Sequence, residues 1–313
     1  MLKTAQAIFF MTACFGLMFT LLLPALFAEV AKPVAAVVDG QSIWVTDSGD
    51  HRLVKLRASD GTLLGSYPIP SPLRLIYDGQ NVWTVSNAGV VTKVQAKDGV
   101  VLGSYPAGGP AAGIAFDGEN VWVSNPENDK VTKIRASDGS IVGSYKVGKS
   151  PDGLLFDGQF IWVANSGTNT VNKIKASDGS IAGTYTVQDS PAEFAFDGQN
   201  VWVTNYGSHT VSKLRGSDGS LVGTYPVGKF PRSIAFDKTN IWVTDYADNK
   251  VTKLRASDGM LLGTYNVGRD PGSITFDGSN IWVTNYGSEN VMKLKPADGS
   301  TIGTFPLSGH VNP

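Results

Sequence analysis

An all-β fold made from one repeated unit is predicted by three features of the sequence. All seven tryptophans recur at intervals of 39 or 40 residues, at Trp44, Trp83, Trp122, Trp162, Trp202, Trp242 and Trp282. Each interval holds four short segments rich in β-branched and aromatic residues, separated by Gly, Asn, Asp or Pro. No segment of the repeat shows ten residues of helical periodicity. Four short strands repeated seven times predict a seven-bladed β-propeller with four antiparallel strands per blade.

Residues 1–28 have the features of a secretory signal peptide. Lys3 is followed by an apolar stretch over residues 5–23, then by Pro24, and Ala28 is a small residue suited to cleavage. An uncleaved membrane anchor is the alternative, because a stretch of this length can span a bilayer. In both cases we expect residues 29–313 to lie outside the cytoplasm, in the periplasm or secreted.

Residues 29–313 are predicted to form a single propeller whose blades are contiguous in sequence. The first strand is expected at residues 33–39 and the last at 301–305. No strand is therefore shared between blade one and blade seven as a clasp. We expect the ring to close by side-chain packing between these two blades.

Within one repeat, strands are expected at residues 231–237, 240–245, 251–255 and 261–265. Asp-Gly pairs mark the turns between strands one and two in six copies and between strands three and four in all seven. Glycine supplies the positive φ that such turns need, so we interpret these carboxylates as turn residues and not as a calcium array.

Two residues of the repeat recur at fixed positions in the blade. The tryptophan on strand two is expected to form a ring of aromatic contacts between neighbouring blades. A lysine recurs on strand three, and we interpret these lysines as solvated edge charges that can stack on aromatic faces: Lys55, Lys93, Lys133, Lys173, Lys213, Lys253 and Lys293.

Composition excludes several classes of protein. With 26 Lys and Arg against 27 Asp and Glu, the chain lacks the basic excess expected of a nucleic-acid-binding protein. Its one cysteine, Cys14, lies in the N-terminal apolar stretch, so residues 29–313 cannot form disulfides or zinc–thiolate sites.

The repeat resembles the YVTN-type β-propeller family. The resemblance rests on Trp202-Val-Thr-Asn205, Trp282-Val-Thr-Asn285 and Trp162-Val-Ala-Asn165, and covers about residues 33–306. It implies an extracytoplasmic seven-bladed propeller associated with cell surfaces and binding, without a defined reaction. The chain is more distantly similar to streptogramin lyase and NHL-type propellers. The lyase pattern of His and Glu with magnesium is not met, because no His follows the proline of any first strand.

Asymmetry between copies locates the candidate binding site. The loops from strand four to strand one and from strand two to strand three share one face, and these loops vary. Just after the first-strand prolines, charged residues interrupt a small, neutral set at Arg74, Asp152, Glu193 and Arg232. They can hold a zwitterionic or polar ligand at the channel mouth, or they can pair with one another as surface ion pairs.

An aromatic arc is predicted beside these charges. Tyr206, Tyr246 and Tyr286 each follow a tryptophan by four residues in blades five, six and seven, and Phe230 lies in a neighbouring loop. The arc suits stacking on a sugar or a peptide side chain, although recent duplication of the repeat also explains it.

No catalytic, metal-ligating or cofactor-binding residue is predicted. His51 and His209 replace turn residues seven positions after a tryptophan, and no catalytic triad or phosphate loop is readable. We therefore expect a binding or scaffold protein that engages a protein, peptide or glycan at the cell envelope, with no nucleic acid and with membrane contact only through an uncleaved N-terminus. The alternative is a metal-assisted lyase or hydrolase that uses Asp152 and Glu193.

Overall fold

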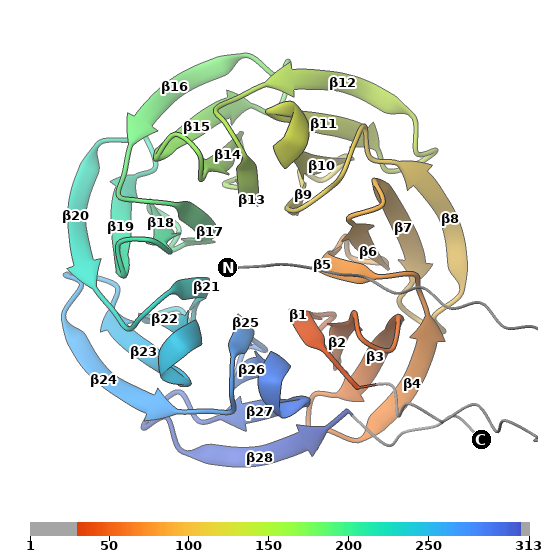
Figure 1. The fold of residues 1–313 in the computed structure, drawn as a ribbon, viewed down its shortest axis with the longest axis vertical. Coiled ribbons are helices and arrows are strands. Elements are labelled where there is room, and N and C mark those ends of the chain that lie inside the picture. The colour runs from red at the N-terminus through yellow and green to blue at the C-terminus, as the bar shows by residue number, and fades with distance from the viewer. Residues whose placement is uncertain (1–29, 308–313) are drawn as a thin grey trace, which may run out of the picture.

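The computed structural model describes residues 30–307, in which all strands belong to seven four-stranded antiparallel sheets. The sheets stand around a central axis as the blades of a ring (Figure 1). This confirms the predicted seven-bladed propeller. Residues 30–307 contain no α-helix, only three single 3₁₀ turns, η1 (Pro126–Asn128), η2 (Tyr246–Asp248) and η3 (Tyr286–Ser288). The predicted signal peptide at 1–28 lies outside the described residues.

Each blade runs outward from the axis in chain order. The innermost strands are β1 (Pro33–Val38), β5 (Pro72–Tyr77), β9 (Ile114–Phe116), β13 (Pro151–Phe156), β17 (Pro191–Phe196), β21 (Pro231–Phe236) and β25 (Pro271–Phe276). The second strands, which carry the tryptophans, are β2 (Ser42–Asp47), β6 (Asn81–Ser86), β10 (Asn120–Asn125), β14 (Phe160–Asn165), β18 (Asn200–Asn205), β22 (Asn240–Asp245) and β26 (Ile281–Asn285).

The third and fourth strands complete the blades. The third strands are β3 (Arg52–Arg57), β7 (Val90–Gln95), β11 (Lys130–Arg135), β15 (Thr170–Lys175), β19 (Thr210–Arg215), β23 (Lys250–Arg255) and β27 (Asn290–Leu294). The outermost strands are β4 (Leu63–Pro68), β8 (Val101–Pro106), β12 (Ile141–Lys146), β16 (Ile181–Thr186), β20 (Leu221–Pro226), β24 (Leu261–Asn266) and β28 (Thr301–Pro306).

The tryptophans lie between the blades, as predicted, and all seven are fully buried. Trp202, for example, packs against Ile234, Ile241 and Leu254 of the next blade. Its ring lies 5.5 Å, between centroids, from the ring of Tyr225 in the same blade. The prediction that the tryptophans make aromatic contacts with neighbouring blades is therefore wrong. Each indole Nε1 also donates to the aspartate of the preceding turn between strands one and two, over 2.7 to 2.9 Å. That aspartate therefore fixes the tryptophan as well as the turn.

The glycines between strands three and four have a second role besides the turn. Gly179 adopts a φ of +75°, which favours glycine, and a Cβ there would also collide with the ring of Tyr145 from the preceding blade. The same arrangement recurs at every junction, with Phe305 in place of tyrosine over Gly61. These turns hold neighbouring blades together.

The lysines on strand three are not solvated edge charges, and that prediction is wrong. Strand three lies inside the sheet, and Lys173 is only 3% exposed. Its Nζ donates to the carbonyl oxygens of Gly216 and Ser217 in the next blade, at 2.6 and 3.0 Å, and lies 5.1 Å from the centre of the Trp162 ring. Each of the other six lysines donates to at least one carbonyl oxygen of the next blade and lies over its own tryptophan. The predicted stacking on aromatic rings is confirmed.

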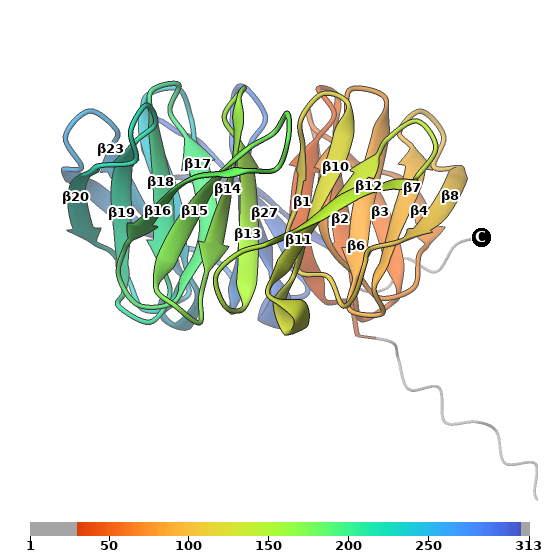
Figure 2. The same ribbon diagram turned by 90° about the horizontal axis from the view of Figure 1, so that it is seen from above.

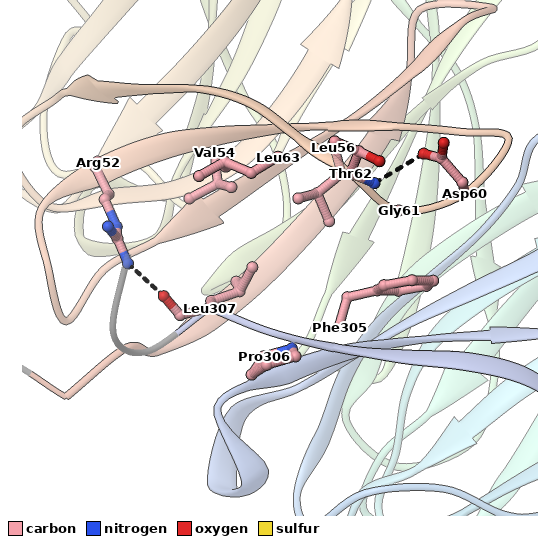
Figure 3. A pocket seen from close by; sticks show the side chains of 10 residues that line it. All are labelled: Arg52, Val54, Leu56, Asp60, Gly61, Thr62, Leu63, Phe305, Pro306 and Leu307. Atoms are coloured by element: carbon pink, nitrogen blue, oxygen red, sulfur yellow. Dashed lines mark hydrogen bonds between the residues drawn. The ribbon is translucent and has the colours of Figure 1, made fainter. Parts of the chain in front are cut away.

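The ring closes without a shared strand, as predicted. Blade one is β1–β4 and blade seven is β25–β28. Trp282 packs against Ile43 and Val45, and Lys293 donates to Ala58 and Ser59. At the outer part of this seam, Arg52 donates to the carbonyl oxygen of Leu307 over 2.8 Å, beside an apolar cavity of about 310 Å³ (Figure 3).

The two kinds of variable loop share one face of the ring. Figure 2 shows that the chain enters β1 on the same side as the helical turn that follows β10. Hydrogen bonds join the two kinds of loop directly, as between the Ser190 N–H and the Asn169 side chain, 3.0 Å apart. We call this side the variable face and the side with the Asp-Gly turns the uniform face.

Candidate functional site

The four charged residues predicted at the channel mouth all lie at the start of innermost strands. Arg74, Asp152, Glu193 and Arg232 begin β5, β13, β17 and β21, where each strand leaves its proline on the variable face. Register shifts follow the prolines in these strands, so the next residues do not alternate as in regular β-structure. Asp152 and Arg232 directly follow the proline, whereas Arg74 and Glu193 are one residue further along the strand.

Three of these charges pair with one another. The Arg74 guanidinium lies 3.0 Å from the Asp152 carboxylate and also contacts the Glu193 carboxylate. Because these residues belong to blades two, four and five, Arg74 extends past blade three and ties together blades that are not all neighbours. Blade three offers only Ala111 and Ala112 at these positions, which leaves room for the long side chain. The alternative that the charges form ion pairs is confirmed for these three residues.

Arg232 is the exception. Its side chain is exposed, and no carboxylate within residues 30–307 forms an ion pair with it. Its guanidinium lies 5.5 Å from the centre of the Tyr246 ring. A cation–π contact at such a partly exposed site contributes about 0.5–1 kcal/mol and leaves the guanidinium N–H donors available to a ligand.

The predicted aromatic arc exists, but it is built as separate contacts. Tyr206 packs on Phe230 with 5.0 Å between centroids, and Tyr246 lies under Arg232. Tyr286 lies under the Nζ of Lys32, 4.9 Å from the ring centre. Tyr206 and Phe230 are 36% and 37% exposed, so this pair is open to solvent.

The phenol of Tyr246 is the most perturbed group of the arc. Burial raises its pKa, and the nearby Asp270 carboxylate acts in the same direction, as do the phenols of Tyr206 and Tyr286. The Arg232 guanidinium opposes them. Tyr246 therefore stays neutral at physiological pH and acts as a hydrogen-bonding aromatic surface.

Three adjoining cavities are lined in part by Arg232. The smallest, of about 220 Å³, is also lined by Arg74 and Glu193. The second, of about 310 Å³, is lined by Pro33, Val34, Ser48, Leu73, Arg232, Tyr246, Gly272 and Tyr286. The largest, of about 570 Å³, extends over blades one to six and is lined by residues that include Arg74, Asp152, Tyr206 and Arg232. Arg232 therefore stands at the boundary of these cavities. Sequence reasoning missed Leu73 and Ser48, because apolar and small side chains carry no recognisable signal.

The histidines occupy turns, as interpreted from the sequence. His209 has a φ of +59°, and its Nδ1 accepts the Phe230 N–H over 3.1 Å. In the neighbouring blades, Asn169 and Asn249 accept the corresponding N–H with their side-chain oxygens. Phe230 itself is held at a φ of +55°, and this strained backbone projects its ring toward Tyr206. Within residues 30–307, no group of three or more His, Cys, Asp or Glu side chains is placed to hold a metal ion.

A buried carboxylate lies under the same face and was not predicted. Asp245 is 1% exposed, accepts hydrogen bonds from Gly228 and Thr252, and stands where blades four, five and seven have asparagine. Burial raises the pKa of Asp245 to about 7. Comparing the copies could have identified the position, since Asp47 and Asp245 are buried aspartates where blade two has Ser86 and the other four blades have asparagine.

No helix within residues 30–307 is long and apolar enough to cross a membrane. A family model described as the outer membrane protein assembly factor BamB matches residues 23–145. A search of curated protein sequences finds no match.

Solved structures show the same fold at low sequence identity. A catalytically inactive virginiamycin B lyase from Staphylococcus aureus with quinupristin is 20% identical, with a TM-score of 0.72, and the match covers 83% of this chain and 94% of that one. A streptogramin B lyase is 20% identical, with a TM-score of 0.71 and coverage of 83% and 91%. The hydrazine synthase of Kuenenia stuttgartiensis is 15% identical, with a TM-score of 0.75 and coverage of 90% and 99%. These likenesses support the propeller fold and do not transfer a reaction.

Proposed function

We propose that this chain is an extracytoplasmic binding or scaffold protein that engages a protein, a peptide or a glycan through its variable face. One observation carries the proposal. On the variable face, the aromatic rings of Tyr206, Tyr246 and Tyr286 and the unpaired guanidinium of Arg232 border two adjoining cavities. Aromatic and arginine side chains are the residue types that most often dominate binding energy.

The cellular setting of the proposal is the envelope. Residues 1–28 read as an export signal, and the matching family model is described as a factor in outer membrane protein assembly. The Trp-Val-Thr-Asn sequences at 202–205 and 282–285 support the finer assignment to a YVTN-type repeat. A rigid ring with asymmetric loops suits such a binding role, because loops on a rigid scaffold carry function.

A lyase or hydrolase is the second candidate, favoured by the structural likeness to virginiamycin B lyase. In that case Asp152 and Glu193 are the carboxylates to test. Both already contact the Arg74 guanidinium, which competes with any proton or cation for their oxygens. Turnover that depends on an added divalent ion and disappears in Glu193→Gln would establish this candidate.

The binding proposal is tested by capture of partners from the native envelope. The full chain, tagged and expressed in its own host, is compared with the double variant Arg232→Ala/Tyr246→Ala. A partner retained by the wild type and lost by the double variant is expected.

The matched control is Arg215→Ala/Asp218→Ala. It removes an exposed ion pair, whose nitrogen and oxygen lie 3.2 Å apart, from the uniform face, and it should leave capture unchanged. Capture of the same partners by both double variants would contradict the proposed site, and the absence of partners would favour the enzymatic candidate.

A further inference from the structure

We infer that the cavity between Arg232, Tyr246 and Tyr286 receives the C-terminal residue of a peptide, with its free carboxylate on Arg232 and an apolar side chain between the walls. We call this cavity the carboxylate pocket. The inference rests on the proposed binding function and names the ligand class of the same site.

The walls of the carboxylate pocket are apolar or aromatic. Pro33, Val34 and Leu73 form its channel side, and the rings of Tyr246 and Tyr286 form the outer side. At about 310 Å³ it lies at the lower end of the range for ligand sites, so it suits a single residue and not an extended chain.

The charge at the pocket is positive. Arg232 contributes a guanidinium without an ion pair, and no carboxylate is among the lining residues. Lys32 adds a second positive charge on the Tyr286 ring. The nearby Asp270 lies beside Gly287 and does not line the pocket. The Asp152 and Glu193 carboxylates form ion pairs with Arg74. The planar guanidinium can bind both oxygens of a carboxylate.

These features favour a peptide C-terminus over other acidic ligands. A C-terminal residue carries its carboxylate and its side chain on one Cα, so a pocket of this size accommodates both. An internal Asp or Glu would need a second residue to supply the apolar contact. An acidic sugar also presents several hydroxyls, whereas the lining offers only one hydroxyl, that of Ser48, besides the two phenols.

The test is a fluorescence anisotropy titration of the full chain with an N-terminally labelled Gly-Gly-Phe peptide, as free acid and as C-terminal amide. Peptides ending in Leu and Trp are measured in the same way. At least one of the free acids should bind at least tenfold more tightly than its amide. Arg232→Gln should reduce the affinity for that acid to the level of the amide, and Tyr246→Ala should weaken both forms.

The control variant is Arg269→Gln, which removes an exposed arginine from the same face but outside the carboxylate pocket. It should bind the acid as the wild type does. Equal binding of acid and amide, binding that survives Arg232→Gln, or no binding of any of the peptides would overturn the inference. Glucuronate that displaces the acid at equal concentration would assign the pocket to acidic sugars instead.

The two proposals fail separately. If the peptides do not bind but envelope partners are lost in Arg232→Ala/Tyr246→Ala, the proposed function stands and only the ligand class is wrong. If the peptides bind through Arg232 but no partner is captured, the pocket is real and the scaffold role is contradicted.

Discussion

On the uniform face, the seven turns between strands three and four carry the same Asp-Gly pair, and each glycine lies under an aromatic ring of the preceding blade. On the variable face, the residues after the first-strand prolines differ from blade to blade. Both faces come from the same repeat, so the difference separates two requirements. Contacts between neighbouring blades are needed at all seven junctions, so the residues that make them are repeated. A single binding site instead needs residues that differ between the blades.

The largest expected effect compares two aromatic residues of blade five. Trp202→Leu should lower the free energy of unfolding by about 4 kcal/mol, because it leaves a cavity between blades and removes the partner of Asp197. Tyr206→Leu, four residues later at the exposed site, should cost no more than about 1 kcal/mol. Urea denaturation of both variants measures these changes. Equal losses in the free energy of unfolding would contradict the distinction between repeated contacts and variable positions.

A smaller effect is expected at the glycines with positive φ. Gly179→Ala should cost about 3 kcal/mol, because the methyl group adds a collision with Tyr145 to the backbone strain. Gly198→Ala has a φ of +91° but open space around it, so only the strain of about 1 kcal/mol remains. Thermal unfolding of the two variants separates the ring contact from the turn conformation.

The lysines on strand three allow a comparison within one strand. Lys173→Met should cost about 2 kcal/mol, because it leaves the Gly216 and Ser217 carbonyls without their donor. Burial lowers the pKa of Lys173, so part of this loss is offset by removing a desolvated charge. Lys175→Met, two residues away and exposed, should be neutral. A neutral Lys173→Met would show that the ring does not depend on this contact.

The smallest predicted effect is a gain on the variable face. The pKa of Asp245 is about 7 in the folded protein, above its ordinary value of 3.8, so the folded state binds more protons between about pH 4 and pH 7. Stability should therefore fall as the pH rises through that window. Asp245→Asn should remove this dependence and raise the free energy of unfolding by about 1 kcal/mol at pH 8. A variant with the pH profile of the wild type would contradict the assignment of the titration to Asp245.

Much of the fold could be predicted because the period, the turn glycines and the strand composition are local signals. The burial of Lys173 could not, since it depends on carbonyl groups supplied by the next blade, about 43 residues away in sequence. The second role of Gly179 is hidden for the same reason, because the ring above it belongs to another repeat.

The residues of the candidate site could be predicted from the sequence, but the contacts between their side chains could not. The sequence placed Arg74 and Arg232 one residue apart in the repeat, just after the first-strand prolines of two blades, yet one is paired with two carboxylates and the other is not. Which charges meet across a channel depends on side-chain reach and on the small residues of blade three. Asp245 is different, because comparing the copies would have singled it out together with Asp47, the equivalent aspartate of blade one.

The melting temperature of Arg232→Ala/Tyr246→Ala tests most directly whether recognition and stability are separated between the faces. The double variant should melt within about 2 °C of the wild type, because it removes an exposed guanidinium and a half-buried ring whose mutual contact lies within blade six. Lys173→Met, measured beside it, should melt several degrees lower. If the double variant were destabilised as much as Lys173→Met, Arg232 and Tyr246 would contribute to the stability of the ring. Loss of binding in that variant would then no longer locate the binding site.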